Sequence, residues 1–265
     1  MVTKKMSLLN WSNIAAWALM VIINGLAGST TLIGGKVTAE VSDANPTLIT
    51  PAGYVFAIWG VIYILLAVFI LFQALPGERT RPFQEKVGWL FVASSVLNIA
   101  WIFAWQYEQL LVTVFLTALL LLTLIAIYLR LDIGRSKVGR SELLAVHVPF
   151  SVYLGWVTIA TIANISIWLV SIGWDGWGIA AETWALLIIV VATLIASLVA
   201  ITRRDIAYEA VIAWAFIGIS VNQVDHPSVS ALLLICVVVV LVVLVVSIYY
   251  SRSRLGRLHI RKKHS

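Results

Sequence analysis

Aromatic and amide side chains recur at helical spacing in three long apolar segments, and they are the side chains best suited to hold a ligand. The three stripes consist of Phe56, Trp59 and Tyr63; of Asn98, Trp101 and Trp105; and of Tyr153, Trp156, Ala160 and Asn164. Residues three and four apart lie on one face of a helix. Amide groups at membrane depth usually face the inside of a bundle, so Asn98 and Asn164 mark the inward faces. We therefore expect the three stripes to face one another.

A cavity with aromatic walls and few polar groups would suit a flat apolar ligand held by stacking and one or two hydrogen bonds. A rise of about 1.5 Å per residue places Trp59 and Asn98 about 12 Å, and Asn164 about 9 Å, below the outer ends of their helices. Trp156 lies at about 21 Å and would form a floor. The connection from Gly34 to Thr50 is long enough to cover the opening. The alternative is ordinary packing, in which the asparagines bond neighbouring helices.

Composition indicates that these stripes belong to an all-α integral membrane protein. The chain has 265 residues, of which 62% are hydrophobic and 11% are charged, and its mean hydropathy is +1.01. A spanning helix needs about 20 mostly apolar residues, because lipid cannot satisfy exposed backbone groups. Eight segments are predicted as spans, of which the seventh is the shortest. They are Trp11 to Ile33, Ala52 to Leu75, Gly88 to Gln106, Gln109 to Leu131, Leu143 to Val170, Gly178 to Ile201, Ile206 to Val221 and Val229 to Tyr250.

Basic residues are distributed unevenly between the connections of this eight-span arrangement. With the N-terminus in the cytoplasm, seventeen Lys and Arg residues fall inside and only Lys36 falls outside. The positive-inside rule predicts this asymmetry. We expect both termini in the cytoplasm of a multi-pass protein in the plasma membrane of a prokaryote, with the lipid bilayer as a partner. The net charge of +6 is thus a topology signal, and we expect no nucleic-acid binding.

Tryptophans also gather near the predicted outer boundaries of the spans. Trp105, Trp174, Trp177 and Trp184 lie there. Indole rings are enriched at the membrane–water interface, so we interpret these residues as interface anchors.

Three motifs in this order resemble the tryptophan-rich sensory protein family (TspO/MBR, the translocator-protein family). The stretch Pro51-Ala-Gly-Tyr-Val-Phe-Ala-Ile-Trp59-Gly-Val-Ile-Tyr63 is similar to the second-helix motif of that family. Leu97-Asn98-Ile-Ala-Trp101-Ile-Phe103 is similar to its third-helix motif, and Trp156, Ala160 and Asn164 keep the spacing of its fifth. The resemblance covers roughly Trp11 to Val170.

The resemblance implies a five-helix bundle that binds porphyrins and, in some members, sterols or other hydrophobic ligands beneath the first loop. Carried over by motif, Trp59 and Trp156 are the pocket aromatics, and Asn98, Trp101, Ala160 and Asn164 complete the wall. Two indoles beside an excited porphyrin would also allow light-dependent modification of the porphyrin without a metal or an added cofactor. We expect a binding or sensory protein for porphyrin-like tetrapyrroles, with no resident cofactor; a homodimer is compatible with this interpretation.

The sequence departs from the family pattern at three places. Pro149-Phe150 lies seven residues before Trp156, where the family commonly has Pro-Tyr four residues before this tryptophan, so the kink is displaced by about one turn. Ile165-Ser-Ile-Trp-Leu follows the fifth-helix asparagine in place of an aromatic-then-basic motif, which argues against sterol binding. The first loop keeps only Pro46 and Pro51 and lacks the tryptophan with paired prolines.

We predict that the chain has three parts. Residues 1–172 form the five-helix bundle, residues 173–250 add about three transmembrane helices, and residues 251–265 form a basic cytoplasmic tail. The additional helices lie outside the region that resembles the family. They are either a lateral surface for a partner or a stabilising addition.

Other functional classes find less support in the sequence. No predicted span contains the lysine that a retinal photoreceptor needs, and the single cysteine, Cys236, excludes an intramolecular disulfide. His147 and Glu209 are the candidates for a proton path, but both lie near cytoplasmic ends, and His147 is expected to be a satisfied interfacial histidine. No hydrolase or metal constellation is visible. A transporter of a small hydrophobic compound remains the alternative function.

Overall fold

The computed structural model describes residues 6–263, with side chains as far as residue 251, and the described residues are helical without any strand. Eight long helices and several short turns account for this chain. The elements are α1 (Leu8–Ser29), α2 (Thr38–Asp43), η1 (Gly53–Ala57), α3 (Ile58–Ala74), α4 (Pro82–Val87), α5 (Leu90–Gln106), α6 (Leu110–Leu131), α7 (Arg140–Glu142), η2 (Leu143–His147), α8 (Val148–Ser171), η3 (Gly176–Gly178), α9 (Ala181–Thr202), α10 (Ile206–Asn222) and α11 (Pro227–Lys263). The expected all-α membrane fold is confirmed.

Length and composition identify the helices that can cross a membrane. Among the described residues six stretches qualify: α1, η1 with α3, α6, α7 through α8, α9, and the first 25 residues of α11. The apolar helices α5 and α10 have 17 residues each and fall just below the usual spanning length. The chain is therefore a multi-pass membrane protein, and the count of eight spans stays a prediction. The helix α11 does not end at Tyr250 but continues to Lys263, so the predicted tail begins as a prolongation of this helix.

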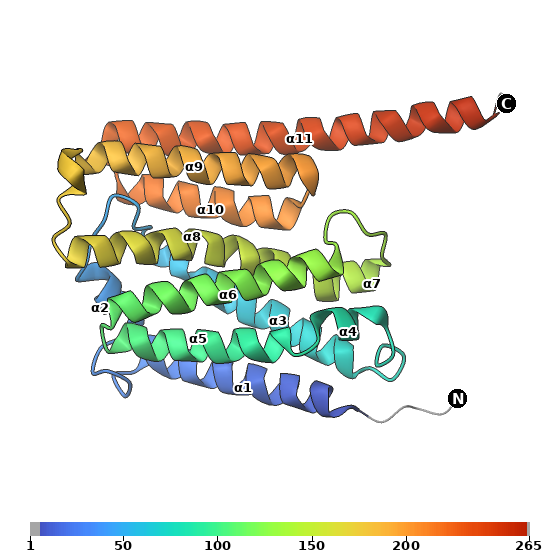
Figure 1. Ribbon diagram of the computed structural model, residues 1–265, viewed down its shortest axis with the longest axis horizontal. Helices are drawn as coiled ribbons and strands as arrows, with labels where there is room; N and C mark the ends of the chain where they lie inside the picture. The colour runs from blue at the N-terminus through green and yellow to red at the C-terminus, as the bar shows by residue number, and fades with distance from the viewer. Residues whose placement is uncertain (1–5, 264–265) are drawn as a thin grey trace.

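The long helices form two groups, and α8 of the first group also contacts the second (Figure 1). The five-helix core consists of α1, α3, α5, α6 and α8, and the extension consists of α9, α10 and α11. In the core α8 packs against α3 and α6, and on its other side it packs against α10. The contact between α8 and α10 is close, because a Cβ on Gly155 would lie 3.1 Å from Val211. The extension is thus docked on the core along one helix.

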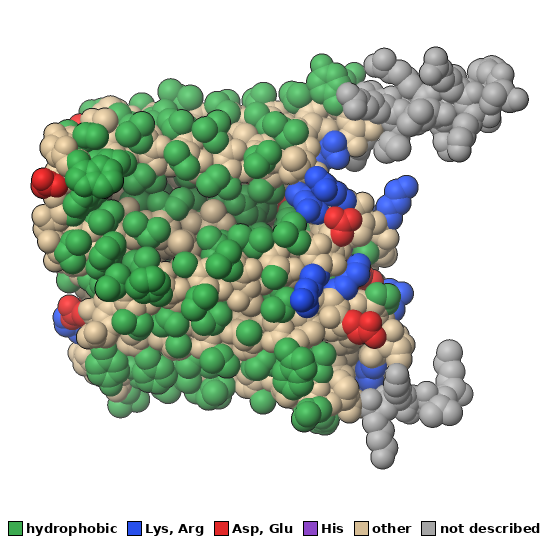
Figure 2. All heavy atoms as spheres, in the orientation of Figure 1, with side chains coloured by type: hydrophobic (Ala, Val, Ile, Leu, Met, Phe, Trp, Pro, Cys, Tyr) green, Lys and Arg blue, Asp and Glu red, His purple; other side chains and the backbone are tan. Residues whose placement is uncertain are grey.

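Charged side chains gather at one end of the bundle, where α1 begins and α11 projects (Figure 2). Nine Lys and Arg residues with described side chains lie in the connections there: Arg79, Arg81, Lys86, Arg130, Arg135, Lys137, Arg140, Arg203 and Arg204. We call this the basic end. The opposite end holds the connection between α1 and η1, and we call it the loop end. This distribution matches the predicted charge asymmetry, while the side of the membrane remains a prediction.

Phenylalanines fill the interior of the core toward the basic end. The ring of Phe69 lies 5.1 Å from that of Phe150 and 5.2 Å from that of Phe91, measured between centroids. These rings are fully buried. Close-packed rings leave no space for a ligand here, so any cavity of the core has to lie toward the loop end.

A wide helical turn accommodates Pro149. Proline has no backbone N–H and its ring crowds the preceding turn, so a regular α-helix cannot continue through it unchanged. The chain forms a π-helical segment, η2, just before it, in which the Val148 amide donates to the Leu143 carbonyl five residues back. Such π-turns widen a helix locally. The irregularity therefore ends about two and a half turns before Trp156, and the helix between them is regular.

Candidate functional site

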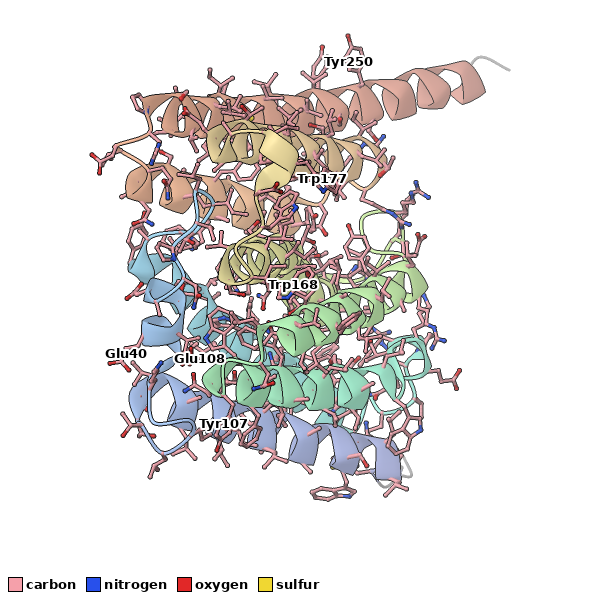
Figure 3. The ribbon with its side chains drawn as sticks, turned by 60° about the vertical axis from the view of Figure 1, so that its left-hand side comes forward. Glu40, Tyr107, Glu108, Trp168, Trp177 and Tyr250 are labelled. Carbon is pink, nitrogen blue, oxygen red and sulfur yellow. The ribbon has the colours of Figure 1, made fainter. Side chains whose placement is uncertain are left out.

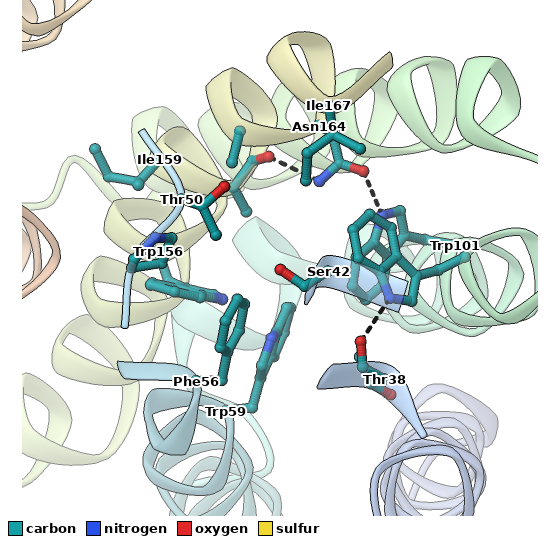
Figure 4. A pocket seen from close by; sticks show the side chains of 14 residues that line it. Thr38, Ser42, Thr50, Phe56, Trp59, Trp101, Trp156, Ile159, Asn164 and Ile167 are labelled. Atoms are coloured by element: carbon teal, nitrogen blue, oxygen red, sulfur yellow. Dashed lines mark hydrogen bonds between the residues drawn. The ribbon is translucent and has the colours of Figure 1, made fainter. Parts of the chain in front are cut away.

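A cavity with largely aromatic walls lies in the core toward the loop end (Figure 4). Its volume is about 40 Å³. Fourteen residues line it: Thr38, Ser42, Thr50, Pro51, Phe56, Trp59, Trp101, Trp105, Trp156, Ile159, Ala160, Ala163, Asn164 and Ile167. We call it the aromatic cavity. Its walls come from η1, α3, α5 and α8, and its roof comes from the connection between α1 and η1.

The structure brings most of the predicted site residues to this cavity. Six of them line it, namely Phe56, Trp59, Trp101, Trp156, Ala160 and Asn164. Tyr63 and Tyr153 lie behind Trp59, with ring centroids 5.8 Å and 6.1 Å from it. Asn98 is fully buried one turn from Trp101 and is also outside the lining. The three stripes do face one another, as their spacing predicted.

Trp59 is the centre of the aromatic arrangement. Its ring stacks on that of Trp101 at a centroid distance of 5.8 Å and meets the ring of Trp156 edge-on at 6.2 Å. Phe56 meets Trp156 edge-on as well, at 6.0 Å. Figure 4 shows Phe56, Trp59 and Trp156 together on one side of the cavity, opposite Asn164. The rings form a continuous aromatic wall.

Hydrogen bonds fix the orientation of two indoles. Trp101 Nε1 donates to Asn164 Oδ1 at 3.1 Å, and Asn164 Nδ2 donates to the Ala160 carbonyl at 2.8 Å. Trp105 Nε1 donates to the Thr38 carbonyl of the roof at 3.1 Å. Asn164 thus bonds a neighbouring helix, as the packing alternative predicted, and it also lines the aromatic cavity.

Two polar atoms of the lining are buried and unpaired. Within the described part of the chain, neither Ser42 Oγ nor Trp156 Nε1 has a hydrogen-bond partner. Ser42 is 2% exposed, and so is Trp156. A buried donor without a partner costs about 1–3 kcal/mol relative to a paired one. A ligand with acceptor atoms would recover this energy, so the cavity favours such ligands.

The roof is held from the core by Gln106. Its side-chain amide donates to the carbonyls of Ala27, Ile33 and Lys36, at 3.1, 3.3 and 2.8 Å. Gly34 makes this approach feasible, since its φ is +72° and a Cβ there would lie 2.3 Å from the Gln106 carbonyl oxygen. The first half of the roof is therefore tied to the end of α5.

The second half of the roof is held by the extension. Asn222 Nδ2 donates to the Thr50 carbonyl at 3.1 Å, and Gln223 Nε2 donates to the Thr47 carbonyl at 3.2 Å. The Ala52 amide donates to the Gly218 carbonyl of α10 at 3.0 Å. The additional helices, to which the sequence assigned no role, thus help to position the roof.

Some lining residues were not predicted from the sequence. Ile159, Ala163 and Ile167 continue the predicted stripe of α8 at spacings of three and four residues, so periodicity alone was a sufficient signal for them. Thr38 and Ser42 come from the roof, where no repeating pattern marks the residues that face inward.

Two expectations about single residues were wrong. Trp105 is only 4% exposed and contacts the roof, so it is not an interface anchor. His147 is 2% exposed, and its Nε2 has no hydrogen-bond partner among the described residues, so it is not a satisfied interfacial histidine. Glu209 lies one turn into α10, near the basic end as expected, but it is completely buried and neither carboxylate oxygen finds a described partner. The described residues contain no group of three metal-ligating side chains.

Comparison with known proteins assigns the chain to a family. No curated protein and no solved structure matches it. The family of TSPO-like proteins matches residues 10–247, which is most of the chain. This match continues beyond Val170, where the motif resemblance ended, and includes α9, α10 and the membrane part of α11. The chain therefore belongs to the TSPO-like protein family, a family of membrane proteins with binding or sensory roles.

Proposed function

We propose that this protein binds porphyrin-like tetrapyrroles in the aromatic cavity and acts as a binding or sensory protein in the membrane. The observation that carries the proposal is the pairing of aromatic walls with two buried donors, Ser42 Oγ and Trp156 Nε1, that have no partner among the described residues. A tetrapyrrole offers a flat ring system for stacking and acceptor atoms for both donors.

The cavity is small and has to widen before it can hold a ligand of this class. Its volume of about 40 Å³ lies far below the roughly 300–1,000 Å³ that is usual for small-molecule sites. Trp59 and Trp101 are already stacked on each other, so a macrocycle cannot slide between them without separating the rings. Tyr63 stacks on Trp59 from behind, so we expect entry of the ligand to separate Trp101 from Trp59 or to lift the roof.

Titration of the purified protein in phospholipid nanodiscs with protoporphyrin IX tests the proposal. The Soret absorbance should change saturably, and Trp156→Leu should weaken binding by about 1–3 kcal/mol as stacking and a hydrogen bond are lost. Trp89→Leu is the matched control, because Trp89 is 56% exposed and outside the cavity. Unchanged affinity in Trp156→Leu would place the porphyrin elsewhere.

A transporter of a small hydrophobic compound is the second candidate function. A small apolar void of about 20 Å³ lies between α8, α9 and α10 and shares Ile159 with the aromatic cavity. A ligand that leaves the core toward the extension would have to widen this void. Proteoliposomes distinguish the two functions: saturable binding without vectorial flux supports the binding protein, and flux that depends on Trp156 supports the transporter.

We also propose that both termini face the cytoplasm of a prokaryotic cell, because α1 begins and α11 projects at the basic end. Single cysteines in a Cys236→Ser background can test this orientation by labelling intact cells. Ala44 and Val224 are exposed at the loop end, and Gly139 is exposed at the basic end. Positions 44 and 224 should react with an impermeant maleimide, and position 139 should not. The reverse pattern would invert the topology.

A further inference from the structure

A second and larger cavity lies at the loop end, between the core and the extension. It has a volume of about 520 Å³ and opens in part to the outside. Its walls come from residues 46–49 of the roof, the end of α8, the start of α9 and the turn between α10 and α11. The connection from α8 to α9 crosses this end of the molecule, with Trp177 on it (Figure 3). We call this space the junction cavity.

The amides of Asn222 and Gln223 present their oxygens to the junction cavity. Each side chain uses its NH₂ group to bond a roof carbonyl, that of Thr50 or of Thr47. A carbonyl can only accept, so the orientation of both amides is determined by their partners. Neither amide oxygen accepts a hydrogen bond from any described residue. Gln223 is 6% exposed, whereas Asn222 is exposed.

Asp175 adds a negative charge to the lining of the junction cavity. One of its oxygens accepts from the Trp177 amide at 2.9 Å, and the other is available. No Lys or Arg belongs to the described lining. The loop end as a whole has six carboxylates against a single cation, Lys36, which pairs with Glu108. The electrostatic potential at this cavity therefore favours a cationic ligand.

Aromatic side chains reinforce this preference. Trp174 and Trp184 both line the cavity, with ring centroids 5.3 Å apart. Trp184 Nε1 is already used, since it donates to the Gly176 carbonyl at 2.9 Å. An indole face attracts cations with about 0.5–2 kcal/mol. His226 and Ser166 also line the cavity and can accept as well as donate.

The floor of the junction cavity is apolar. Ile188 lies seven residues after Ala181 on α9, which places it about 10 Å deeper along the helix. Ile49 of the roof and Ala185 complete this part of the lining. Ile49 and Ile188 also line the smaller apolar void below. Polar acceptors thus lie at the opening of the junction cavity, and apolar side chains lie at its floor.

We propose that the junction cavity binds a hydrophobic primary amine. The lining supplies acceptors for the ammonium group, namely Asp175 and the amide oxygens of Asn222 and Gln223, and the apolar body lies against Ile49 and Ile188. This site is separate from the aromatic cavity and does not depend on tetrapyrrole binding. Both a free hydrophobic amine and the headgroup of phosphatidylethanolamine carry this chemistry.

Equilibrium dialysis against protein in phosphatidylcholine nanodiscs tests the proposal, with empty nanodiscs subtracted. The probe is 2-(1-naphthyl)ethylamine, compared with 1-naphthylacetate and 2-(1-naphthyl)ethanol, which carry the same ring with an anionic or a neutral head. The amine should bind saturably and at least roughly tenfold more tightly than the acid, because the rim carries acceptors and negative charge. Equal binding of the amine and the acid would overturn the proposal.

Two substitutions locate the site. Asp175→Asn keeps an oxygen for the Trp177 amide and removes the charge, so amine affinity should fall roughly three- to tenfold at low salt and less at high salt. Ala181→Trp fills the cavity from an exposed position and should abolish binding. Asp43→Asn removes an exposed loop-end charge outside the lining and should have no effect.

The remaining outcomes are also decisive. Unchanged amine affinity in both Asp175→Asn and Ala181→Trp would show that the amine binds elsewhere and would overturn the proposal. Trp156→Leu should leave amine binding intact, which separates this test from that of the porphyrin site. Competition by phosphatidylethanolamine in mixed nanodiscs would identify the lipid as the source of the amine, and its absence would identify a free amine.

Discussion

The two cavities at the loop end differ in the polar atoms that they leave unpaired. In the aromatic cavity these atoms are donors, Ser42 Oγ and Trp156 Nε1, surrounded by indole and phenyl rings. In the junction cavity they are the oxygens of Asp175, Asn222 and Gln223. The first arrangement suits a ligand rich in acceptors, and the second suits a ligand that donates. One chain can thus select two opposite chemistries within one end of a small bundle.

The two cavities also differ in the elements that build them. The aromatic cavity is lined mainly by helix faces inside the core, whereas the polar rim of the junction cavity comes from helix ends and connections. The roof belongs to both, because Thr50 and Pro51 line the first cavity and residues 46–49 line the second. The positions of residues along the core helices therefore determine the aromatic cavity, and the docking of the extension on the core determines the junction cavity.

The largest expected effect comes from breaking the core side of the roof. Gly34 and Gly35 both have a positive φ, but only at Gly34 would a Cβ meet the Gln106 carbonyl, while nothing lies within 4 Å at Gly35. Gly35→Ala should cost about 1–2 kcal/mol of stability from backbone strain alone. Gly34→Ala should lose about 2 kcal/mol more from the collision. Thermal unfolding of both variants checks this difference, and equal midpoints would contradict it.

Porphyrin and amine binding by the Gly34→Ala variant shows whether the two cavities depend on the same part of the roof. Gly34→Ala should weaken porphyrin binding, because the roof of the aromatic cavity shifts. Amine binding should be retained, since the extension holds residues 46–49 independently. Loss of both activities would mean that the roof moves as one unit.

Gln223→Leu should break the extension side of the roof. The Thr47 carbonyl keeps the Thr50 amide as a donor, so the variant loses one part-buried hydrogen bond, which contributes about 0.5–1.5 kcal/mol. The variant should unfold at a lower temperature and bind the amine more weakly, with a smaller effect on porphyrin affinity. Val224→Ser, at an exposed neighbouring position, serves as the control. A larger effect on porphyrin than on amine would reverse the proposed division between the sites.

Trp156→Phe should have a smaller effect that isolates the donor. The ring contact with Trp59 is kept in part, while the unpaired Nε1 is removed. Porphyrin affinity should fall by about 0.5–1.5 kcal/mol, the usual contribution of one hydrogen bond. Stability should not fall by the same amount, because no protein hydrogen bond is lost. Calorimetric titration and thermal unfolding of the same sample distinguish these two quantities.

Illumination of the porphyrin complex addresses chemistry and has the smallest expected effect. Trp59 and Trp156 both line the aromatic cavity and are oxidisable neighbours of an excited porphyrin. The parent protein should bleach the porphyrin faster than Trp59→Phe or Trp156→Phe variants that still bind it. Equal bleaching rates would mean that the two indoles only shape the site.

Local patterns were sufficient to predict the helical membrane fold and the inner faces of α3, α5 and α8. Hydropathy and helical spacing depend on neighbouring residues alone. They placed Trp59, Trp101 and Trp156 on facing stripes, and the structure confirms this arrangement. The position of Pro149 did not disturb Trp156, because η2 absorbs the irregularity before the regular part of α8 begins.

The sequence by itself thus determined a multi-pass helical chain with three aromatic faces, since these properties repeat along each helix. Tertiary structure alone decided which atoms remain unpaired and what the extension does. Ser42, Asn222 and Gln223 lie in or beside connections, where no period marks the inward side. Their hydrogen bonds join segments more than 170 residues apart in the case of the two amides. Such contacts exist only after α10 has packed against α8, so the roof and the junction cavity arise from the docking of the extension on the core.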